Sequence, residues 1–267
     1  MSGLSRFDGV EFQHHDMVSE PLLEDAMITR LLVDRNDALW IGTAQGKLYL
    51  HENGRFRPRP CPSPGHVTAL LDGRDGALWA GGTRGVLRLA GDGATWIVGP
   101  GVSVTSLIET DEAIWAASRD AVLRITPGDD GATYRIERRV TEPRSWEMGT
   151  LLADPRGLLL FGNATIDRLR SATVDHIRLA TMLDATLWDS IRTAQETWEI
   201  YDAYRDAHDT VWLSTATGLF RVAADGLAPG ALPVNPPRRV LPYTLTGRVN
   251  RVIRDADGAL WVATEVR

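Results

Sequence analysis

One short motif recurs along the chain, and it constrains the fold more than any other feature. In five of its six copies a tryptophan follows Asp, Gly or Glu by three positions and precedes a small residue by two, and the fourth copy has leucine at the tryptophan position. The copies read DALWIGT (37–43), GALWAGGT (76–83), EAIWAAS (112–118), GLLLFGN (157–163), DTVWLST (209–215) and GALWVAT (258–264). Successive copies lie 36 to 52 residues apart, a spacing typical of repeat architectures in which each repeat is one supersecondary unit.

The residues around each motif predict four short strands per repeat. Alternating apolar runs precede the motif at 28–33, 67–71, 104–108, 201–204 and 249–253, and runs of the G-L-x-R-F type follow it at 47–50, 86–89, 122–125 and 219–222. These runs have strand periodicity and are too short for helices. Four antiparallel strands per repeat are typical of a β-propeller blade, so we expect an all-β, six-bladed propeller that forms one domain over residues 1–267. A β-sandwich is the alternative, but it does not require the same tryptophan frame six times.

The recurring tryptophans are expected to be structural. The blade tryptophans are Trp40, Trp79, Trp115, Trp212 and Trp261, and Leu160 takes the same position in the fourth repeat. A single blade would leave one sheet face in water, and stacking the next blade against that face buries it. Small residues two positions further on, such as Gly42 and Gly81, allow a neighbouring backbone to come close.

The two ends of the chain predict ring closure. The last repeat stops after its second strand, and the GLSRF segment near Met1 fits the third-strand pattern. We therefore expect a closing blade shared by the N- and C-termini, which would pair otherwise open sheet edges. The alternative is that the chain is a piece of a longer repeat array.

These motifs resemble the two-component regulator propeller repeat, with DRNDALWIGT (34–43), DADGALWVAT (255–264) and GLSRFDG (3–9) as the nearest matches. The resemblance implies a propeller that forms the sensory part of bacterial signalling receptors, commonly outside the cytoplasm. A more distant likeness, confined to ALWVATE (259–265), is to streptogramin lyase, and it implies a propeller enzyme of the lyase or hydrolase type.

Carboxylates recur beside the motif, and they could suggest calcium loops. They stand at 34, 37, 72, 75, 206, 209, 255 and 257. None of them completes a twelve-residue calcium series, whereas Asp side chains commonly stabilise turns through hydrogen bonds to the backbone. We therefore predict turn residues, no metal and no cofactor. No catalytic motif such as H-E-x-x-H or G-x-S-x-G is found, so catalytic residues are not predicted.

Three long connections interrupt the repeats, and loops held by a rigid scaffold commonly carry binding residues. They span 141–148, 178–199 and 226–247. The candidate ligand-binding residues are Trp146, Trp188, Trp198, Arg238 and Arg239. The alternative for the second connection is a helix docked on the ring, because Leu183, Leu187 and Ile191 have helical spacing.

Composition limits the partners. The net charge of −6 argues against nucleic acid, and no apolar stretch is long enough for a membrane span. The sequence as written has no signal peptide, which predicts a cytoplasmic location, or a periplasmic one if the chain is a receptor fragment. We expect a non-catalytic module that binds a small ligand or a protein partner and passes any signal to a separate signalling protein.

Overall fold

The computed structural model describes residues 4–7, 12–15, 27–131, 133–140, 149–154, 157–162, 165–169, 174–178, 200–206, 210–215, 218–223, 238–239, 248–254 and 260–265. These residues form two compact units, Met1–Pro143 and Arg144–Arg267. All regular elements in the described ranges are β-strands, and every sheet is antiparallel with its strands in chain order.

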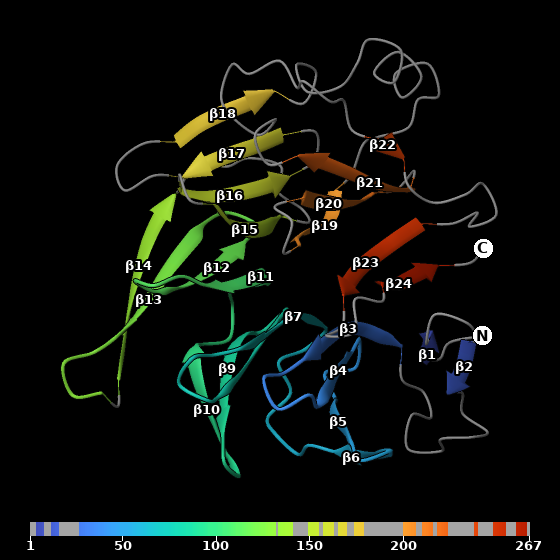
Figure 1. The fold of residues 1–267 in the computed structure, drawn as a ribbon. Coiled ribbons are helices and arrows are strands. Elements are labelled where there is room, and N and C mark those ends of the chain that lie inside the picture. The colour runs from blue at the N-terminus through green and yellow to red at the C-terminus, as the bar shows by residue number, and fades with distance from the viewer. Residues whose placement is uncertain are drawn as a thin grey trace. The chain divides into compact units, whose positions relative to one another are not determined.

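The first unit contains a two-stranded sheet and three four-stranded sheets, in which consecutive strands lie side by side (Figure 1). The two-stranded sheet is β1 (Leu4–Phe7) and β2 (Phe12–His15). The first four-stranded sheet is β3 (Ile28–Val33), β4 (Leu39–Thr43), β5 (Leu48–Glu52) and β6 (Arg55–Pro58). The second is β7 (Val67–Asp72), β8 (Leu78–Gly82), β9 (Gly85–Ala90) and β10 (Gly93–Val98). The third is β11 (Val104–Glu109), β12 (Ile114–Ser118), β13 (Val122–Pro127) and β14 (Tyr134–Val140).

The second unit repeats the same plan. One sheet is β15 (Thr150–Asp154), β16 (Gly157–Gly162), β17 (Thr165–Leu169) and β18 (Val174–Arg178). The next is β19 (Ile200–Arg205), β20 (Thr210–Thr215), β21 (Gly218–Ala223) and β22 (Arg238–Arg239). The last two strands, β23 (Arg248–Arg254) and β24 (Leu260–Glu265), form a two-stranded sheet. The strands predicted from the apolar runs before and after the motifs are therefore confirmed.

The turn between the first two strands of a sheet explains which residues stand three positions before the tryptophan. Asp37 has a φ of 63° and Gly76 a φ of 76°, so both adopt the left-handed conformation that most residue types avoid. Asp34 supports the same turn, because its Oδ1 accepts hydrogen bonds from the backbone N–H groups of Asn36 and Ala38 at 2.9 and 3.0 Å. The predicted role of the acidic residues in turns is confirmed here.

The first strands of successive sheets in the first unit are neighbours: β3 lies beside β7, and β7 beside β11. Each carries a β-bulge that leaves one threonine out of the ladder, namely Thr29, Thr68 or Thr105. The Thr29 hydroxyl donates to the Val67 carbonyl at 2.7 Å, and the Thr68 hydroxyl donates to the Val104 carbonyl. The bulge thus turns a polar side chain toward the next sheet.

Apolar packing between these sheets follows the sequence frame. Trp79 is fully buried in a cluster that joins β8 and β9 to Val104, Leu107 and Leu123 of the next sheet. A Cβ on Gly42 would lie 2.5 Å from Cγ1 of Val67, so only glycine allows this approach. Glycine is thus needed here for close packing, but it makes room for the Val67 side chain and not for a neighbouring backbone as predicted.

The described residues contain no helix with the length and apolar character that a membrane crossing requires. Taken together, the antiparallel four-stranded sheets stacked through their first strands make the fold all-β and propeller-like.

Candidate functional site

Two of the recurring acidic residues accept hydrogen bonds from the indole N–H groups of motif tryptophans. The indole Nε1 of Trp40 donates to Asp34 Oδ2 at 2.9 Å, and that of Trp212 donates to Asp206 Oδ2 at 2.9 Å. In both sheets the aspartate stands six positions before the tryptophan, and one carboxylate binds both the turn backbone and the indole. The sequence predicted the contact with the turn but missed the indole, although the constant six-residue spacing was visible.

In two other sheets the indole N–H donates to a different acceptor, and neither sheet has aspartate six positions before its tryptophan. In the second sheet, which has Gly73 there, Trp79 Nε1 donates to Asp75 Oδ1 at 3.5 Å. In the third sheet Trp115 Nε1 donates to Thr110 Oγ1 at 3.1 Å. Glu109, which stands at the usual position, accepts the backbone N–H of Arg74 at 2.8 Å and so bridges to the preceding sheet.

The arginines of two third-strand runs form ion pairs within their own sheets. Arg88 pairs with Asp75 at 2.7 Å, and Arg124 lies 3.7 Å from Glu112 and Glu137. Contacts between sheets come from turn residues: Arg35 donates to Asp72 at 2.9 Å, and Arg74 lies 2.7 Å from Asp111.

The sheet with Leu160 in place of tryptophan has a buried ionic cluster. Asp154 stands six positions before Leu160, and its carboxylate lies 3.4 Å from Nη2 of Arg168 and 2.6 Å from Nη2 of Arg205. The side chains of Asp154 and Arg168 are 5% and 1% exposed. Guanidinium groups thus replace the indole as donors to this carboxylate.

Ionisation follows these contacts. Burial raises the pKa of Asp75, but the hydrogen bond and charge of Arg88, together with the Ala77 N–H and the Trp79 indole, bring that pKa below its usual value. Burial raises the pKa of the Cys61 thiol, although the nearby Arg59 charge opposes this shift. Burial and the nearby Arg30 charge lower the pKa of His66.

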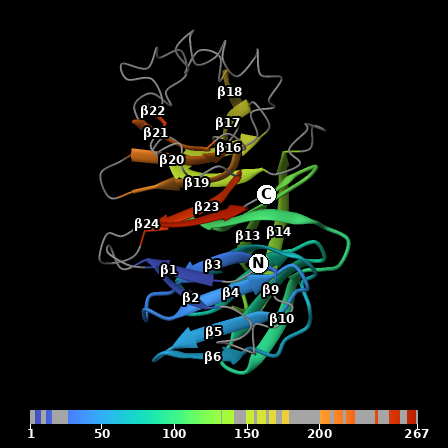
Figure 2. The same ribbon diagram turned by 90° about the vertical axis from the view of Figure 1, so that its right-hand side faces the viewer.

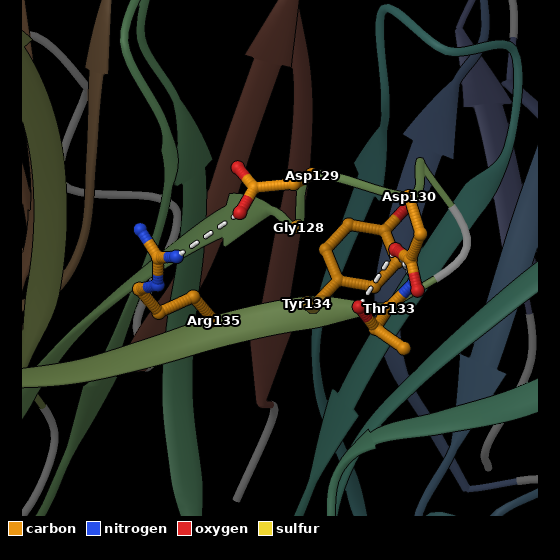
Figure 3. Close-up of a pocket in the computed structure, with 6 residues that line it drawn as sticks. All are labelled: Gly128, Asp129, Asp130, Thr133, Tyr134 and Arg135. Atoms are coloured by element: carbon orange, nitrogen blue, oxygen red, sulfur yellow. Dashed lines mark hydrogen bonds and ion pairs between the residues drawn. The ribbon is translucent and has the colours of Figure 1, made fainter.

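A shallow pocket of about 380 Å³ lies at the turn between β13 and β14 (Figure 3). It is lined by Gly128, Asp129, Asp130, Thr133, Tyr134 and Arg135. Asp130 Oδ1 accepts from the N–H and hydroxyl of Thr133 at 2.9 and 2.7 Å, and Asp129 lies 3.8 Å from Arg135. The Tyr134 ring packs edge-on against Trp79 with a centroid distance of 5.2 Å. The polar groups therefore serve the turn itself, and an open pocket of this kind offers a small polar molecule little enclosure.

The predicted ligand-binding tryptophans, Trp146, Trp188 and Trp198, lie outside the described residues. Arg238 and Arg239 form β22, where Arg238 pairs with Arg221 and Arg239 with Phe220. The prediction that these two arginines lie in a long connection outside the repeats was therefore wrong, because they form the fourth strand of their sheet. Whether the five residues form one binding site stays a prediction. In the ranges that the structure covers, no three His, Cys, Asp or Glu side chains are grouped as a metal site would need.

No family model and no curated protein sequence matches the chain. Solved structures are similar in fold. The extracellular domain of BT4673 from B. thetaiotaomicron, a protein assigned to the one-component systems, matches 98% of this chain with a TM-score of 0.69 and 17% identity. The chain spans only 34% of that domain's length.

Two further structures have comparable folds. The gluconolactonase XC5397 from Xanthomonas campestris matches 85% of this chain over 79% of its own length, with a TM-score of 0.58 and 16% identity. PorZ, a surface component of the type-IX secretion system of Porphyromonas gingivalis, matches 98% of this chain over 41% of its own length, with a TM-score of 0.60 and 14% identity. At these identities the likeness establishes only the propeller-like fold, which is found both in the extracellular domain of BT4673 and in a gluconolactonase.

Proposed function

We propose that the chain is a non-catalytic propeller module that senses a ligand or binds a protein partner, like the sensor region of bacterial two-component regulators. The observation that carries this proposal is the match of nearly the whole chain to the extracellular domain of BT4673. The contacts of the turn carboxylates support it, because Asp34, Asp75 and Asp206 hold indole and backbone groups of the scaffold.

The architecture we propose is a single domain over residues 1–267 with six blades, the last shared between β1–β2 and β23–β24. Leu4 supports this arrangement, because it is buried against Ile41, Tyr49 and Phe56 of the first four-stranded sheet, as a strand of a preceding blade would be. In such a module the blades fix the loops, and any signal passes to a separate protein.

We place the binding surface on the long connections that carry Trp146, Trp188 and Trp198, together with Arg238 and Arg239 of β22. Aromatic and arginine side chains are the residues that most often dominate binding surfaces. Because the chain spans about a third of the BT4673 domain, it also fits a segment of a longer receptor, which would place it outside the cytoplasm.

The second candidate is a propeller enzyme of the lyase or hydrolase type. The gluconolactonase match favours it, since that enzyme and this chain are of similar length. A functional enzyme would need several acid, base or metal-binding groups grouped in one site.

One pair of measurements separates the two candidates. Purified protein is assayed for hydrolysis of D-glucono-1,5-lactone with and without Ca²⁺, Mg²⁺ or Zn²⁺, and a panel of sugars, organic acids and amino acids is screened by thermal shift. The sensor proposal predicts no hydrolysis above the uncatalysed rate and at least one stabilising compound, whose effect is lost in a variant with Trp146, Trp188 and Trp198 changed to Ala. Metal-dependent hydrolysis would overturn it.

A further inference from the structure

The outer margin of the junction between the first two four-stranded sheets carries three arginines at alternate positions. Arg55 and Arg57 belong to β6, the edge strand of its sheet, and Arg59 follows it directly (Figure 2). We call Arg55, Arg57 and Arg59 the arginine stripe. Alternate residues of a strand point to the same side, so these side chains share one face, about 7 Å apart along the strand.

The sheet register shows which face this is. Phe56 points the other way and is buried against Ile41 and Tyr49. Arg57 stands opposite Leu50, which stands opposite Trp40. Trp40 packs in the cluster that joins the first sheet to the second, so the arginine stripe lies on the side facing the second sheet.

The second sheet contributes to the same margin. Nη2 of Arg59 donates to the Gly91 carbonyl, and Nη1 lies 3.8 Å from Asp92, in the turn between β9 and β10. Trp96 of β10 is partly buried and packs against the same cluster as Trp40. Trp96 and the arginine stripe thus lie on the facing sides of the first two sheets, and both residue types are enriched at the centres of protein interfaces.

Two arginines of the stripe are available to a partner. Arg55 and Arg57 are exposed, and the structure gives neither an ion pair nor a side-chain hydrogen bond among the residues it describes. Glu52 stands opposite Arg55 in the ladder, but the structure gives no ion pair between them. This contrasts with Arg88 and Arg124, whose partners are given above.

Prolines make the stripe rigid and exclude strand pairing as its role. Pro58, Pro60, Pro62 and Pro64 alternate through and beyond the end of β6. Proline fixes φ and removes the N–H that an added strand would need, so this edge is already protected from pairing without its arginines. Fixed backbone also lowers the entropy lost on binding.

We propose that the arginine stripe and Trp96 form a docking surface for an extended acidic segment of a partner protein. The guanidinium groups of Arg55 and Arg57 would each pair with a carboxylate of the partner, and charge complementarity selects this partner. The proposal rests on the protein-binding form of the proposed function and adds the chemistry of the partner. Nucleic acid fits poorly because the whole chain carries a net charge of −6.

The test uses the full chain and a fluorescein-labelled deca-glutamate peptide, followed by fluorescence anisotropy at 50 and 200 mM NaCl. We expect binding to the unmodified protein at low salt, weakening at higher salt. Arg55→Gln with Arg57→Gln should lower the affinity about tenfold. The matched control is Arg84→Gln with Arg119→Gln. Both arginines are exposed, and among the described residues the structure shows no partner for either side chain. The control should lower the affinity less than twofold.

Three results would overturn the proposal: no binding to the unmodified protein, an equal loss in both double variants, or tighter stripe-dependent binding of heparin than of the peptide. The last result would assign the stripe to an anionic polysaccharide. Circular dichroism of each variant checks folding. The thermal-shift screen and its tryptophan variant do not involve the arginine stripe. The docking proposal can therefore fail while the proposed function holds, and the proposed function can fail while the docking proposal holds.

Discussion

The sheet of β7 to β10 and the sheet of β15 to β18 solve the same structural problem with different chemistry. Both have an acidic side chain at the first turn. In the former, Asp75 binds the Trp79 indole and Arg88 near the surface, with 35% of its side chain exposed. In the latter, with Leu160 in place of the tryptophan, Asp154 is buried and binds Arg168 and Arg205.

The comparison shows that these two sheets both keep a carboxylate at the first turn and differ in the groups that donate to it. An indole brings a large apolar surface together with one N–H, so packing and hydrogen bonding come from one side chain. Leucine keeps the apolar packing but has no N–H, so the carboxylate needs charged donors from elsewhere. Burying such charged groups costs free energy unless they are fully paired. The two sheets should therefore differ strongly in their response to loss of an arginine.

The largest expected effect is at the buried cluster. Arg168→Met should lower the free energy of unfolding by about 3 to 5 kcal/mol, because Asp154 stays buried with one of its partners removed. Urea denaturation followed by circular dichroism measures this. The counterpart Arg88→Met should cost less than about 1 kcal/mol, since that ion pair is partly exposed. Equal costs for the two variants would refute the distinction between the sheets.

The next effect concerns the tryptophan itself. Trp79→Leu, which copies the fourth repeat into the second, should cost about 2 to 3 kcal/mol, because Trp79 is fully buried and the smaller side chain leaves a cavity. Thermal and urea unfolding check the value. The reverse change, Leu160→Trp, should also destabilise, by about 1 to 3 kcal/mol through overpacking. A stabilising Leu160→Trp would mean that the fourth sheet keeps room for an indole.

A smaller effect is expected at the contact between first strands. Thr68→Val keeps the shape of the side chain but removes its hydroxyl bonds to the Gly81 and Val104 carbonyls, and should cost about 1 kcal/mol. Hydrogen exchange should show faster opening at Val104. The control is the same change at an exposed position of the outer strand β10, Thr95→Val, which should alter stability by less than about 0.5 kcal/mol. A Thr68→Val variant as stable as this control would show that the hydroxyl contributes nothing to the contact.

The smallest expected effect is a pH dependence from Asp75. Its pKa is lower in the folded than in the unfolded chain, so its stabilising contribution is present above the ordinary pKa of about 4 and is lost as the pH falls through the folded value. Partial exposure limits the contribution to less than about 1 kcal/mol. Comparing unfolding of the unmodified protein and Asp75→Asn between pH 7 and pH 3 measures it. A difference that grows toward low pH would contradict the assigned sign.

Much of the fold was predictable because the same sequence pattern recurs in successive repeats. Strand runs such as 28–33, the turn role of Asp34 and the close approach at Gly42 follow from local chemistry and recur several times. The Asp154 cluster was not predictable, because Arg205 comes from the next sheet and a single sequence does not show which charges become buried. The candidate tryptophans belong to non-repeating segments of the sequence, where no second copy helps the interpretation. The short strand β22, with Arg238 and Arg239, was missed for the same reason.

The account depends most on the two ends of the chain sharing one blade, and cysteine cross-linking tests this directly. The native cysteine is first removed by Cys61→Ser. In the second four-stranded sheet Trp79 stands opposite Arg88 and Ala80 opposite Leu87. If β24 and β1 pair in the same register, Trp261 stands opposite Arg6 and Val262 opposite Ser5, so the test pair is Ser5→Cys with Val262→Cys. The account predicts rapid disulfide formation under mild oxidation and a higher midpoint of urea unfolding. The control pair, Ser5→Cys with Ala153→Cys, should stay unlinked. If the thiols of the test pair are reactive but also stay unlinked in the folded protein, the closed ring is contradicted.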